Sequence, residues 1–582
     1  MKSLLTLNKY FLKYKSKIIL GIIFILLSNA AQVYIPIILK DSIDALQNNI
    51  SKELIIRYSL LIVGTALLGG FFRFLIRTTI IIVSRKIEYD LRSDFWAHIQ
   101  KLPTRFFQNN STGNLMAHAT NDISAVRMYI GPAVMYSIDT FSKFVIVIII
   151  MLNLNVWLTV YALIPLPLLS FLVYKLSKKI HSRFAKIQEK FSEITAKAQE
   201  SFSGIRVVKS YVREKDELKQ FTKLSDDYLE RNMDKVRIQA FFMPMLFMIT
   251  GFSVIIIIWI GGSMAIEGTL TLGEIMAFVA YLGLLIWPVI AIGWVLNIIQ
   301  QASASMKRLL KIFGEIDDIK DSGISKNGDI SIKGEIEFKD VSFRYGKELP
   351  YILKNINLKI PENSSLAIVG RTGSGKTSLI NLIPRLFDTT EGEVLIDGIN
   401  VKLIPKSELR TNIGLVFQET FLFSDTLYNN IAYGIDTSEK DLINNVSEIS
   451  QLKKDIDTFS NGYETILGER GITLSGGQKQ RTSLARALAI NPKILILDDS
   501  FSAVDTNTEE EILNQLKHFM LGRTSIIISH RISTVKNADN IIVLEDGQII
   551  EQGNHEELIA YGGFYADLHN KQLLEEELKE IE

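Results

Sequence analysis

Residues 366–378 decide the fold of the C-terminal half, and they read Leu366-Ala367-Ile368-Val369-Gly370-Arg371-Thr372-Gly373-Ser374-Gly375-Lys376-Thr377-Ser378. The first four form a short apolar strand and a helical pattern follows the last three, so the glycines stand in the strand-to-helix turn that a phosphate-binding loop requires. Backbone amides would turn inward around the phosphates, Lys376 would reach the terminal phosphates, and the Thr377 hydroxyl would ligate Mg2+. We therefore expect residues 370–378 to bind ATP and Mg2+ in an α/β domain.

Two further apolar runs end in polar side chains. Residues 494–497 stop at Asp498 and Asp499, and residues 525–528 stop at Ser529 and His530. In an open parallel sheet the ligand lies beyond the carboxyl ends of the strands, so these groups are expected to converge with the phosphate-binding loop. Asp498 would hold Mg2+, Asp499 would orient or deprotonate the attacking water, and His530 would sense the terminal phosphate. Taken singly, the acidic pair could be a helix cap and the histidine a structural one.

Composition excludes several classes of function. The chain has 582 residues, 47% of them hydrophobic and 22% charged, with a formal net charge of +1 and no cysteine. Without cysteine there are no disulfides, Cys-based zinc sites or Fe–S clusters. A net charge near zero gives no general attraction to nucleic acid, which we do not expect as a partner.

The N-terminal half contains long apolar stretches that predict membrane helices. Asn153-Leu154-Asn155 is a turn signal that splits the longest of them into two spans. The six expected spans are about 17–39, 57–82, 130–153, 155–177, 240–264 and 272–300. The long loops after the second and fourth spans, and the segment before the first, are rich in Lys and Arg, so both termini are expected in the cytoplasm. The expected location of the chain is a bacterial inner (cell) membrane.

Residues 83–129 and 178–239 are expected to continue the membrane helices into the cytoplasm as two stalks. Each stalk has a break near its tip, at residues 108–113 and 201–204, where either a short transverse helix or a plain capping turn would fit. The lysine-rich residues before the first span are expected to form a short amphipathic helix on the membrane surface, since no signal-peptide cleavage site follows the first apolar run.

Four ionisable residues lie within the expected spans: Arg73, Arg77, Asp139 and Lys143. Charges in a membrane are costly and often face a water-filled path, so these four are candidates for a substrate route. The alternatives are an internal ion pair between Asp139 and Lys143 and an Arg77 side chain that extends to the interface.

Charges and glycines appear at residues 314–318 and 322–325, which indicates a linker. We expect a transmembrane domain over residues 1–325 and a nucleotide-binding domain over residues 326–582. The predicted fold is thus multi-domain: an all-α six-helix transmembrane domain followed by an α/β P-loop ATPase domain.

Leu474-Ser475-Gly476-Gly477-Gln478 resembles the signature of ATP-binding cassette (ABC) proteins. Other markers of that family occur along this chain in the same order as in the family. Tyr345 resembles the aromatic residue that stacks on adenine, and Gln418 resembles the residue that links Mg2+ to the membrane domain. Residues 465–471 resemble the exporter-type segment before the signature. Ser502-Ala503-Val504-Asp505 is similar to the loop at the dimer seam. With six spans ahead of one cassette, the chain resembles an exporter-type half-transporter of the multidrug and lipid flippase group.

The resemblance implies a dimer in which each ATP lies between the P-loop of one chain and the signature of the other. Ser475, Gly476, Gly477 and Gln478 would then act in trans, Asp505 would lie at the seam, and Asp499, His530 and Gln418 would be the catalytic residues. The stalk breaks would be the family's coupling helices.

The sequence departs from the family at Asp499, where most members carry Glu. A carboxylate withdrawn by about 1 Å would slow hydrolysis in principle by roughly a hundredfold. In this family that change often marks one half of a heterodimer, so we expect a heterodimer in preference to a homodimer.

The expected function is ATP-driven export or flipping of amphipathic small molecules or lipids, with membrane lipid and a second half-transporter as partners. The alternative is an ATP-gated channel or a regulatory subunit of a transport complex. A peptide-processing exporter would carry a protease domain with a catalytic cysteine before the first span, and we expect none. The transported substrate does not follow from the sequence.

Overall fold

The computed structural model describes residues 2–48, 51–317, 319, 321, 331–436 and 439–581. These residues form two compact units, one of Met1–Lys101 with Thr112–Ile316 and the other of Leu102–Ser111 with Asp317–Glu582. The predicted boundary between residues 325 and 326, together with the linker at residues 322–325, lies outside the described residues.

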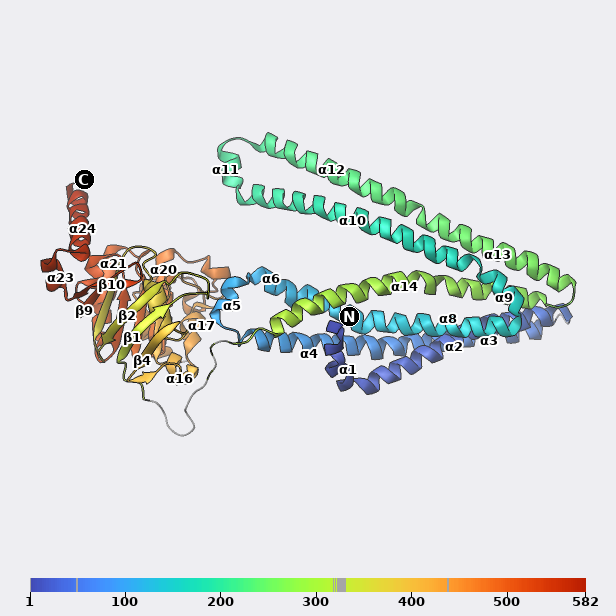
Figure 1. Cartoon of the computed structure of the whole chain (residues 1–582), viewed down its shortest axis with the longest axis horizontal. Helices are drawn as coiled ribbons and strands as arrows, with labels where there is room; N and C mark the ends of the chain where they lie inside the picture. The colour runs from blue at the N-terminus through green and yellow to red at the C-terminus, as the bar shows by residue number, and fades with distance from the viewer. Residues whose placement is uncertain are drawn as a thin grey trace. The chain divides into compact units, whose positions relative to one another are not determined.

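The first unit is helical throughout (Figure 1). Its helices are η1 (Lys2–Leu7), α1 (Asn8–Lys13), α2 (Lys15–Asn48), α3 (Lys52–Ile76), η2 (Arg77–Ile81), α4 (Ile82–Ile99), α6 (Thr112–Ala117), η3 (His118–Asp122), α7 (Ile123–Met128), η4 (Tyr129–Ala133), α8 (Val134–Leu154), α9 (Val156–Leu163), α10 (Pro165–Ser203), α11 (Ile205–Ser210), α12 (Glu214–Ala240), α13 (Phe242–Ile266) and α14 (Leu272–Phe313).

Six helical stretches in the described part of the chain are long and apolar enough to cross a membrane, which confirms the expected number. They are Lys15–Gln47, Lys52–Ile99, Thr112–Leu154, Val156–Ser203, Glu214–Ile266 and Leu272–Phe313. The turn signal at residues 153–155 works through Asn155, whose side-chain oxygen accepts the Leu158 amide at 2.9 Å and caps α9.

The helices extend well beyond the apolar stretches. In Figure 1, α10 and α12 run side by side and are joined by the short helix α11. Ion pairs hold the two together, between Arg183 and Asp234 at 2.7 Å and between Lys197 and Glu217 at 2.9 Å. At the N-terminus, α1 is tied to α4 by Lys9 and Lys13, which pair with Asp94 and Asp90.

The second unit contains two sheets. An antiparallel sheet has the order β2-β1-β4-β5, and a six-stranded sheet has the order β10-β9-β3-β8-β7-β6, with β10 antiparallel at one edge. The strands are β1 (Ile336–Phe343), β2 (Leu353–Ile360), β3 (Ser365–Val369), β4 (Glu391–Ile396), β5 (Ile399–Asn400), β6 (Ile413–Val416), β7 (Ile494–Asp498), β8 (Thr524–Ile528), β9 (Asn540–Glu545) and β10 (Gln548–Gly553).

The central strands of the larger sheet are buried along their whole length, since every residue of β7 and β8 is buried, and their sequences are mostly apolar. The helices are α5 (Thr104–Asn109), α15 (Lys376–Leu382), α16 (Lys406–Thr411), α17 (Leu427–Ile431), η5 (Ala432–Gly434), α18 (Lys440–Ile449), α19 (Lys453–Ile456), η6 (Gly462–Glu464), η7 (Glu469–Gly471), α20 (Gly476–Ala489), α21 (Thr506–Met520), α22 (Ile532–Val535), α23 (His555–Tyr561) and α24 (Phe564–Ile581). The predicted fold class, an all-α transmembrane domain followed by an α/β ATPase domain, is confirmed.

Candidate nucleotide site

Four adjacent parallel strands carry the predicted site residues at their carboxyl ends. The order β3-β8-β7-β6 places the P-loop, His530, the Asp498-Asp499 pair and Gln418 next to one another along one edge of the sheet. This is the edge at which open parallel sheets bind ligands. Strands that are far apart in the sequence are neighbours in space, so the residues meet although up to 160 residues separate them.

The P-loop needs glycine at Gly370 and Gly375. Gly370 has φ +155°, and a Cβ there would lie 2.2 Å from the Leu544 carbonyl oxygen. Gly375 has φ +103° directly before α15, with a would-be Cβ 2.9 Å from Leu353. These positions leave no room for a side chain, so the backbone itself forms the inner wall of the loop.

Lys376 is folded back into its own loop, where its ammonium donates hydrogen bonds to the carbonyl oxygens of Gly370 (2.8 Å) and Arg371 (2.9 Å). Burial lowers the pKa of Lys376, while Asp498 and Asp499 act in the opposite direction. The Ser374 hydroxyl is buried and has no hydrogen-bond partner within the described residues. A cationic side chain, an unsatisfied hydroxyl and open backbone amides are what an anionic phosphate would satisfy, so the residues present fit a nucleotide.

Asp498 and Thr377 are in contact, as a shared Mg2+ site requires. The Thr377 hydroxyl donates to Asp498 Oδ2 at 2.8 Å, and Asp498 is buried at the end of β7. Burial raises the pKa of Asp498, the Thr377 hydrogen bond lowers it, and the neighbouring Asp499 raises it. A buried carboxylate next to a second carboxylate favours a bound cation. The pair therefore fits Mg2+.

Asp499 is half-buried and has a left-handed backbone, with φ +46°, and its amide donates to the Ile528 carbonyl on the neighbouring strand at 2.9 Å. His530 and Gln418 are exposed, and their side chains make no hydrogen bond with the described residues. All three are thus accessible at the sheet edge.

Tyr345 lies against the helix that follows the P-loop. Its hydroxyl is 2.9 Å from Ser378 Oγ, and its ring meets the rings of Phe343 and Phe387 edge to face. A cavity of about 450 Å³ lies beside it, lined by Tyr345 to Leu349 and by Arg105, Gln108 and Asn109. The last three come from α5 and its end, at the predicted break of the first stalk, where the structure has a short helix. A second short helix, α11, follows the other break.

Ser475 is the N-cap of α20. Its hydroxyl accepts the Gln478 amide, and Gln478 Oε1 accepts the Ser475 amide at 3.0 Å, which completes a capping box. Ser475 and Gly476 are exposed, and within the described residues no hydrogen bond joins the signature to the P-loop of the same chain. An exposed helix N-terminus is suited to phosphate.

The sequence did not single out Gln480, which ties the signature helix to the segment at residues 502–505. Its amide donates to Ser502 Oγ and its carbonyl accepts from the Ala503 amide, both at 2.9 Å. Gly477 permits this contact, because a Cβ there would lie 2.9 Å from the Ala503 carbonyl oxygen. Asp505 caps α21 by accepting the Thr508 amide at 2.9 Å, which lowers the pKa of Asp505.

Within the helical unit, a cavity of about 240 Å³ brings together Arg73, Arg77 and Asp139, three of the four predicted intramembrane charges. Lys143 lies 3.6 Å from Asp139, so the expected ion pair is present. The ion pair and the cavity coexist, and both interpretations of these charges keep structural support.

Six apolar helices joined to a cassette with a P-loop, an acidic pair and a signature helix define a membrane protein with an ATP-binding domain. Family models agree: residues 18–289 match the ABC transporter transmembrane region and residues 353–502 match the ABC transporter family. The chain is 35% identical over 579 residues to the multidrug resistance-like ATP-binding protein MdlA of Buchnera aphidicola subsp. Schizaphis graminum, covering 98% of this chain and 99% of that protein.

Two further similarities point the same way. The chain is 37% identical over 490 residues to the ATP-dependent lipid A-core flippase of Desulfotalea psychrophila, covering 84% and 85% of the two chains. The structure of a bacterial Atm1-family ABC exporter with ATP bound matches with a TM-score of 0.77 and 26% identity, over 96% of this chain and 98% of that one. This chain belongs to the ABC transporters, as an exporter-type half-transporter. It is an integral multi-pass membrane protein whose ATPase domain supports transport, and such half-transporters act as dimers.

Proposed function

We propose that this chain is one half of a dimeric pump that exports or flips amphipathic small molecules or lipids by alternating access. The observation that carries the proposal is the placement of the P-loop, Asp498 and His530 at the ends of adjacent strands in a chain with six apolar helices. The proposed location is a bacterial cell membrane with both termini in the cytoplasm, supported by the Lys- and Arg-rich loops after the second and fourth spans.

In the proposed site, residues 370–378 hold the phosphates of ATP and Tyr345 stacks on the adenine. Thr377, Asp498 and Gln418 would hold Mg2+, which would screen the phosphate charge. Ser475, Gly476, Gly477 and Gln478 of the partner would complete the site at their helix N-terminus, with Asp505 at the seam. The exposure of Ser475 and Gly476 in the single chain supports this role.

In the proposed reaction a water oxygen attacks the terminal phosphorus, the bond to the bridging oxygen breaks, and ADP leaves with that electron pair. Asp499 would orient this water and accept its proton, and His530 would contact the terminal phosphate. Asp499 directly follows Asp498 at the end of β7, and His530 follows the neighbouring strand β8, which supports the assignment.

We also propose that Asp499 makes this site weakly hydrolytic and that the partner is a different half-transporter with Glu at this position. The shorter carboxylate supports a slow site. This part of the proposal rests on Asp499 alone, and the purified chain tests it directly. Robust hydrolysis by the chain alone would contradict the heterodimer.

The proposed function is tested by reconstituting the chain in liposomes, alone and with a candidate partner, and measuring Mg2+-dependent ATPase activity together with ATP-dependent movement of a fluorescent amphiphile. Lys376→Ala is expected to abolish both, because it removes the cation that faces the terminal phosphates. Lys440→Ala, an exposed lysine at the start of α18, is the matched control and should change neither. ATPase activity without movement of any amphiphile would favour an ATP-gated channel or a regulatory subunit.

A further inference from the structure

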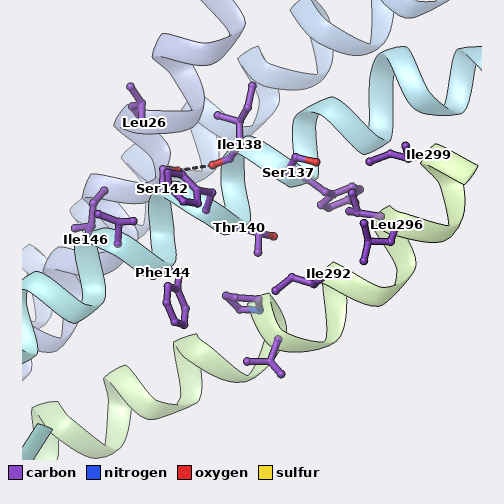
Figure 2. Close-up of a pocket in the computed structure, with 16 residues that line it drawn as sticks. Leu26, Ser137, Ile138, Thr140, Ser142, Phe144, Ile146, Ile292, Leu296 and Ile299 are labelled. Carbon is purple, nitrogen blue, oxygen red and sulfur yellow. Dashed lines mark hydrogen bonds between the residues drawn. The ribbon is translucent and has the colours of Figure 1, made fainter. Parts of the chain in front are cut away.

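Two adjoining cavities lie among the membrane-spanning helices. The larger has a volume of about 1030 Å³ and is lined almost entirely by apolar side chains of α8 and α14, with Leu26 of α2. Figure 2 shows Thr140 and Phe144 on α8 facing Ile292 and Leu296 on α14 across this space. A cavity of this size and composition accommodates the apolar part of an amphiphile.

The smaller cavity, of about 240 Å³, is polar at one side. Arg73 and Arg77 line it, one helical turn apart at the end of α3, together with Asp139 and the rings of Tyr136 and Trp287. Tyr136 lines both cavities, so the apolar and the charged space adjoin at this side chain.

The charges around the smaller cavity do not balance. Lys143 Nζ lies 3.6 Å from Asp139 Oδ2, and the exposed fractions of the two side chains are only 7% and 15%, so this pair neutralises itself. Arg73 and Arg77 form no ion pair with any residue that the structure describes. Two guanidinium groups thus remain without an anionic partner at membrane depth, where an uncompensated charge is costly.

One polar group in the larger cavity is also unsatisfied. Thr140 is 7% exposed, lines the cavity, and its hydroxyl has no hydrogen-bond partner within the described residues.

Guanidinium groups, such as those of Arg73 and Arg77, bind phosphate and carboxylate oxygens in pairs of parallel hydrogen bonds, which an ammonium cannot do.

We propose that these cavities bind an anionic amphiphile, with its acyl chain in the larger cavity and its phosphate or carboxylate head group between Arg73 and Arg77. This proposal rests on the proposed export function and specifies its substrate class. A cationic amphiphile would meet the two guanidinium groups at close range, since Asp139 is already paired with Lys143.

Binding is tested on the purified full-length chain in neutral detergent, by displacement of a fluorescent acyl probe with dodecyl phosphate, dodecyltrimethylammonium or inorganic phosphate. We expect dodecyl phosphate to bind about tenfold more tightly than the cation of equal chain length, and the Arg73→Gln/Arg77→Gln double variant to remove this preference. Arg57→Gln is the matched control, because Arg57 is an exposed arginine on the same helix that lines neither cavity.

Equal binding of the two dodecyl compounds, or a preference that survives the double variant, would overturn the proposal. Displacement by inorganic phosphate alone would also overturn it, because the acyl chain would then add nothing. Once the partner half-transporter is added, a transported amphiphile should be released by Mg2+ and ATP, and an amphiphile that stays bound would overturn the assignment of this site to the transported substrate. Loss of ATPase activity with an intact preference for dodecyl phosphate would contradict the pump and leave the binding site standing.

A second inference comes from the C-terminal helix α24, which forms hydrogen bonds with the backbone on both sides of Arg531. Gln572 Nε2 donates to the His530 carbonyl oxygen at 2.6 Å, and Gln572 Oε1 accepts the Ile532 amide at 2.8 Å. One side chain thus fixes the main chain on both sides of Arg531, including that of His530. Arg531 is held from the other side by Glu509 of α21.

The helix α24 is itself firmly placed at its start. Glu551 of β10 accepts the amides of Phe564 and Tyr565, and the Tyr565 hydroxyl, fully buried, lies 2.8 Å from His555 Nδ1. Gln572 therefore holds the backbone at His530 and Ile532 from a helix that is itself anchored to the cassette.

We infer that Gln572 is a positioning residue for His530. Gln572→Leu is expected to lower kcat of ATP hydrolysis about tenfold while KM for ATP stays nearly constant, since the P-loop contacts are unchanged. Lys571→Leu, exposed on the same helix, is the control. Gln572→Glu keeps the acceptor but loses the donor to His530, so it should give an intermediate rate.

The decisive measurement repeats Gln572→Leu in a His530→Ala background, with apparent Tm recorded for every variant. A residue that acts through His530 has no further effect on kcat once His530 is gone. An equal loss in both backgrounds, or a kcat within about twofold of the wild type in the single variant, would overturn the inference.

Discussion

Asp499 joins a short carboxylate to a left-handed backbone, and both properties matter for its replacement. Asp499→Glu is expected to raise kcat by roughly a hundredfold, because in the proposed reaction the carboxylate would advance by about 1 Å toward the attacking water. It should also lower the apparent Tm slightly, since Asp tolerates φ +46° better than longer side chains do. ATPase assays and thermal unfolding measure the two effects.

Asp340→Glu is the matched control for Asp499→Glu, because Asp340 is exposed in β1 and has φ +49°. It should show the loss in Tm without the gain in rate. An unchanged rate for Asp499→Glu would show that this carboxylate does not limit hydrolysis.

At the same scale, the sequence predicted the site residues that follow strands, but it could not predict the side chains that fix the position of those residues. Thr377 and Asp498 could be placed together because each follows a short apolar run, and the structure has them 2.8 Å apart. Gln480 and Gln572 carry no local signal, since their importance comes from partners 22 to 42 residues away. Only the packing of α20 and α24 reveals such contacts.

At the scale of elements, two helices of the cassette have the same capping box but different expected roles. Ser475 and Gln478 cap α20, and Asn554 and Glu557 cap α23. Ser475→Ala and Asn554→Ala should each cost about 1 kcal/mol of local stability. Only Ser475→Ala is expected to lower ATPase activity as well, because in the proposed dimer its hydroxyl would also face the nucleotide of the partner. Equal rates for the two variants, measured with their unfolding curves, would remove Ser475 from the site.

The docking of α24 is expected to weaken in acid. Burial lowers the pKa of His555, and His569 and Lys536 lower it further while Glu556 raises it. Because the folded state binds this proton less readily than the unfolded state, stability is lost as the pH falls through the ordinary histidine value of about 6.5. The protection factors of the amides of residues 564–574, which are corrected for the slower intrinsic exchange in acid, should therefore fall between pH 7 and pH 5.5. His555→Gln should remove this pH dependence. If the pH dependence persists in that variant, a group other than His555 causes it.

Among the elements, the turn at Asn155 could be predicted because an asparagine cap is a local signal. The π-helical turns at Arg77–Ile81, His118–Asp122 and Tyr129–Ala133 could not, because they depend on how neighbouring helices pack. The same holds for the short helix α5, where the sequence left a transverse helix and a capping turn equally open.

At the scale of the whole molecule, the heterodimer is tested by asking whether two inactive copies of this chain repair one another. Lys376→Ala removes the P-loop function and Ser475→Glu blocks the signature, so neither variant alone can hydrolyse ATP. In a mixed pair of these variants, one composite site would retain both an intact P-loop and an intact signature. If the chain paired with itself, co-expression would restore about a quarter of the wild-type chain's ATPase activity, because half of the pairs would be mixed and each would have one working site.

We expect no restoration, since the proposed partner is a different half-transporter. Restoration to about a quarter would contradict the heterodimer and at the same time support a site shared between two chains. The absence of cysteine from the chain allows a direct check of the pairing, because a cysteine placed at exposed Gly476 of one copy and a cysteine placed at exposed Arg371 of another would face one another only across a shared site. Cross-linking of such copies in membranes, absent after co-expression with the partner, would show that self-pairing occurs but yields to the heterodimer.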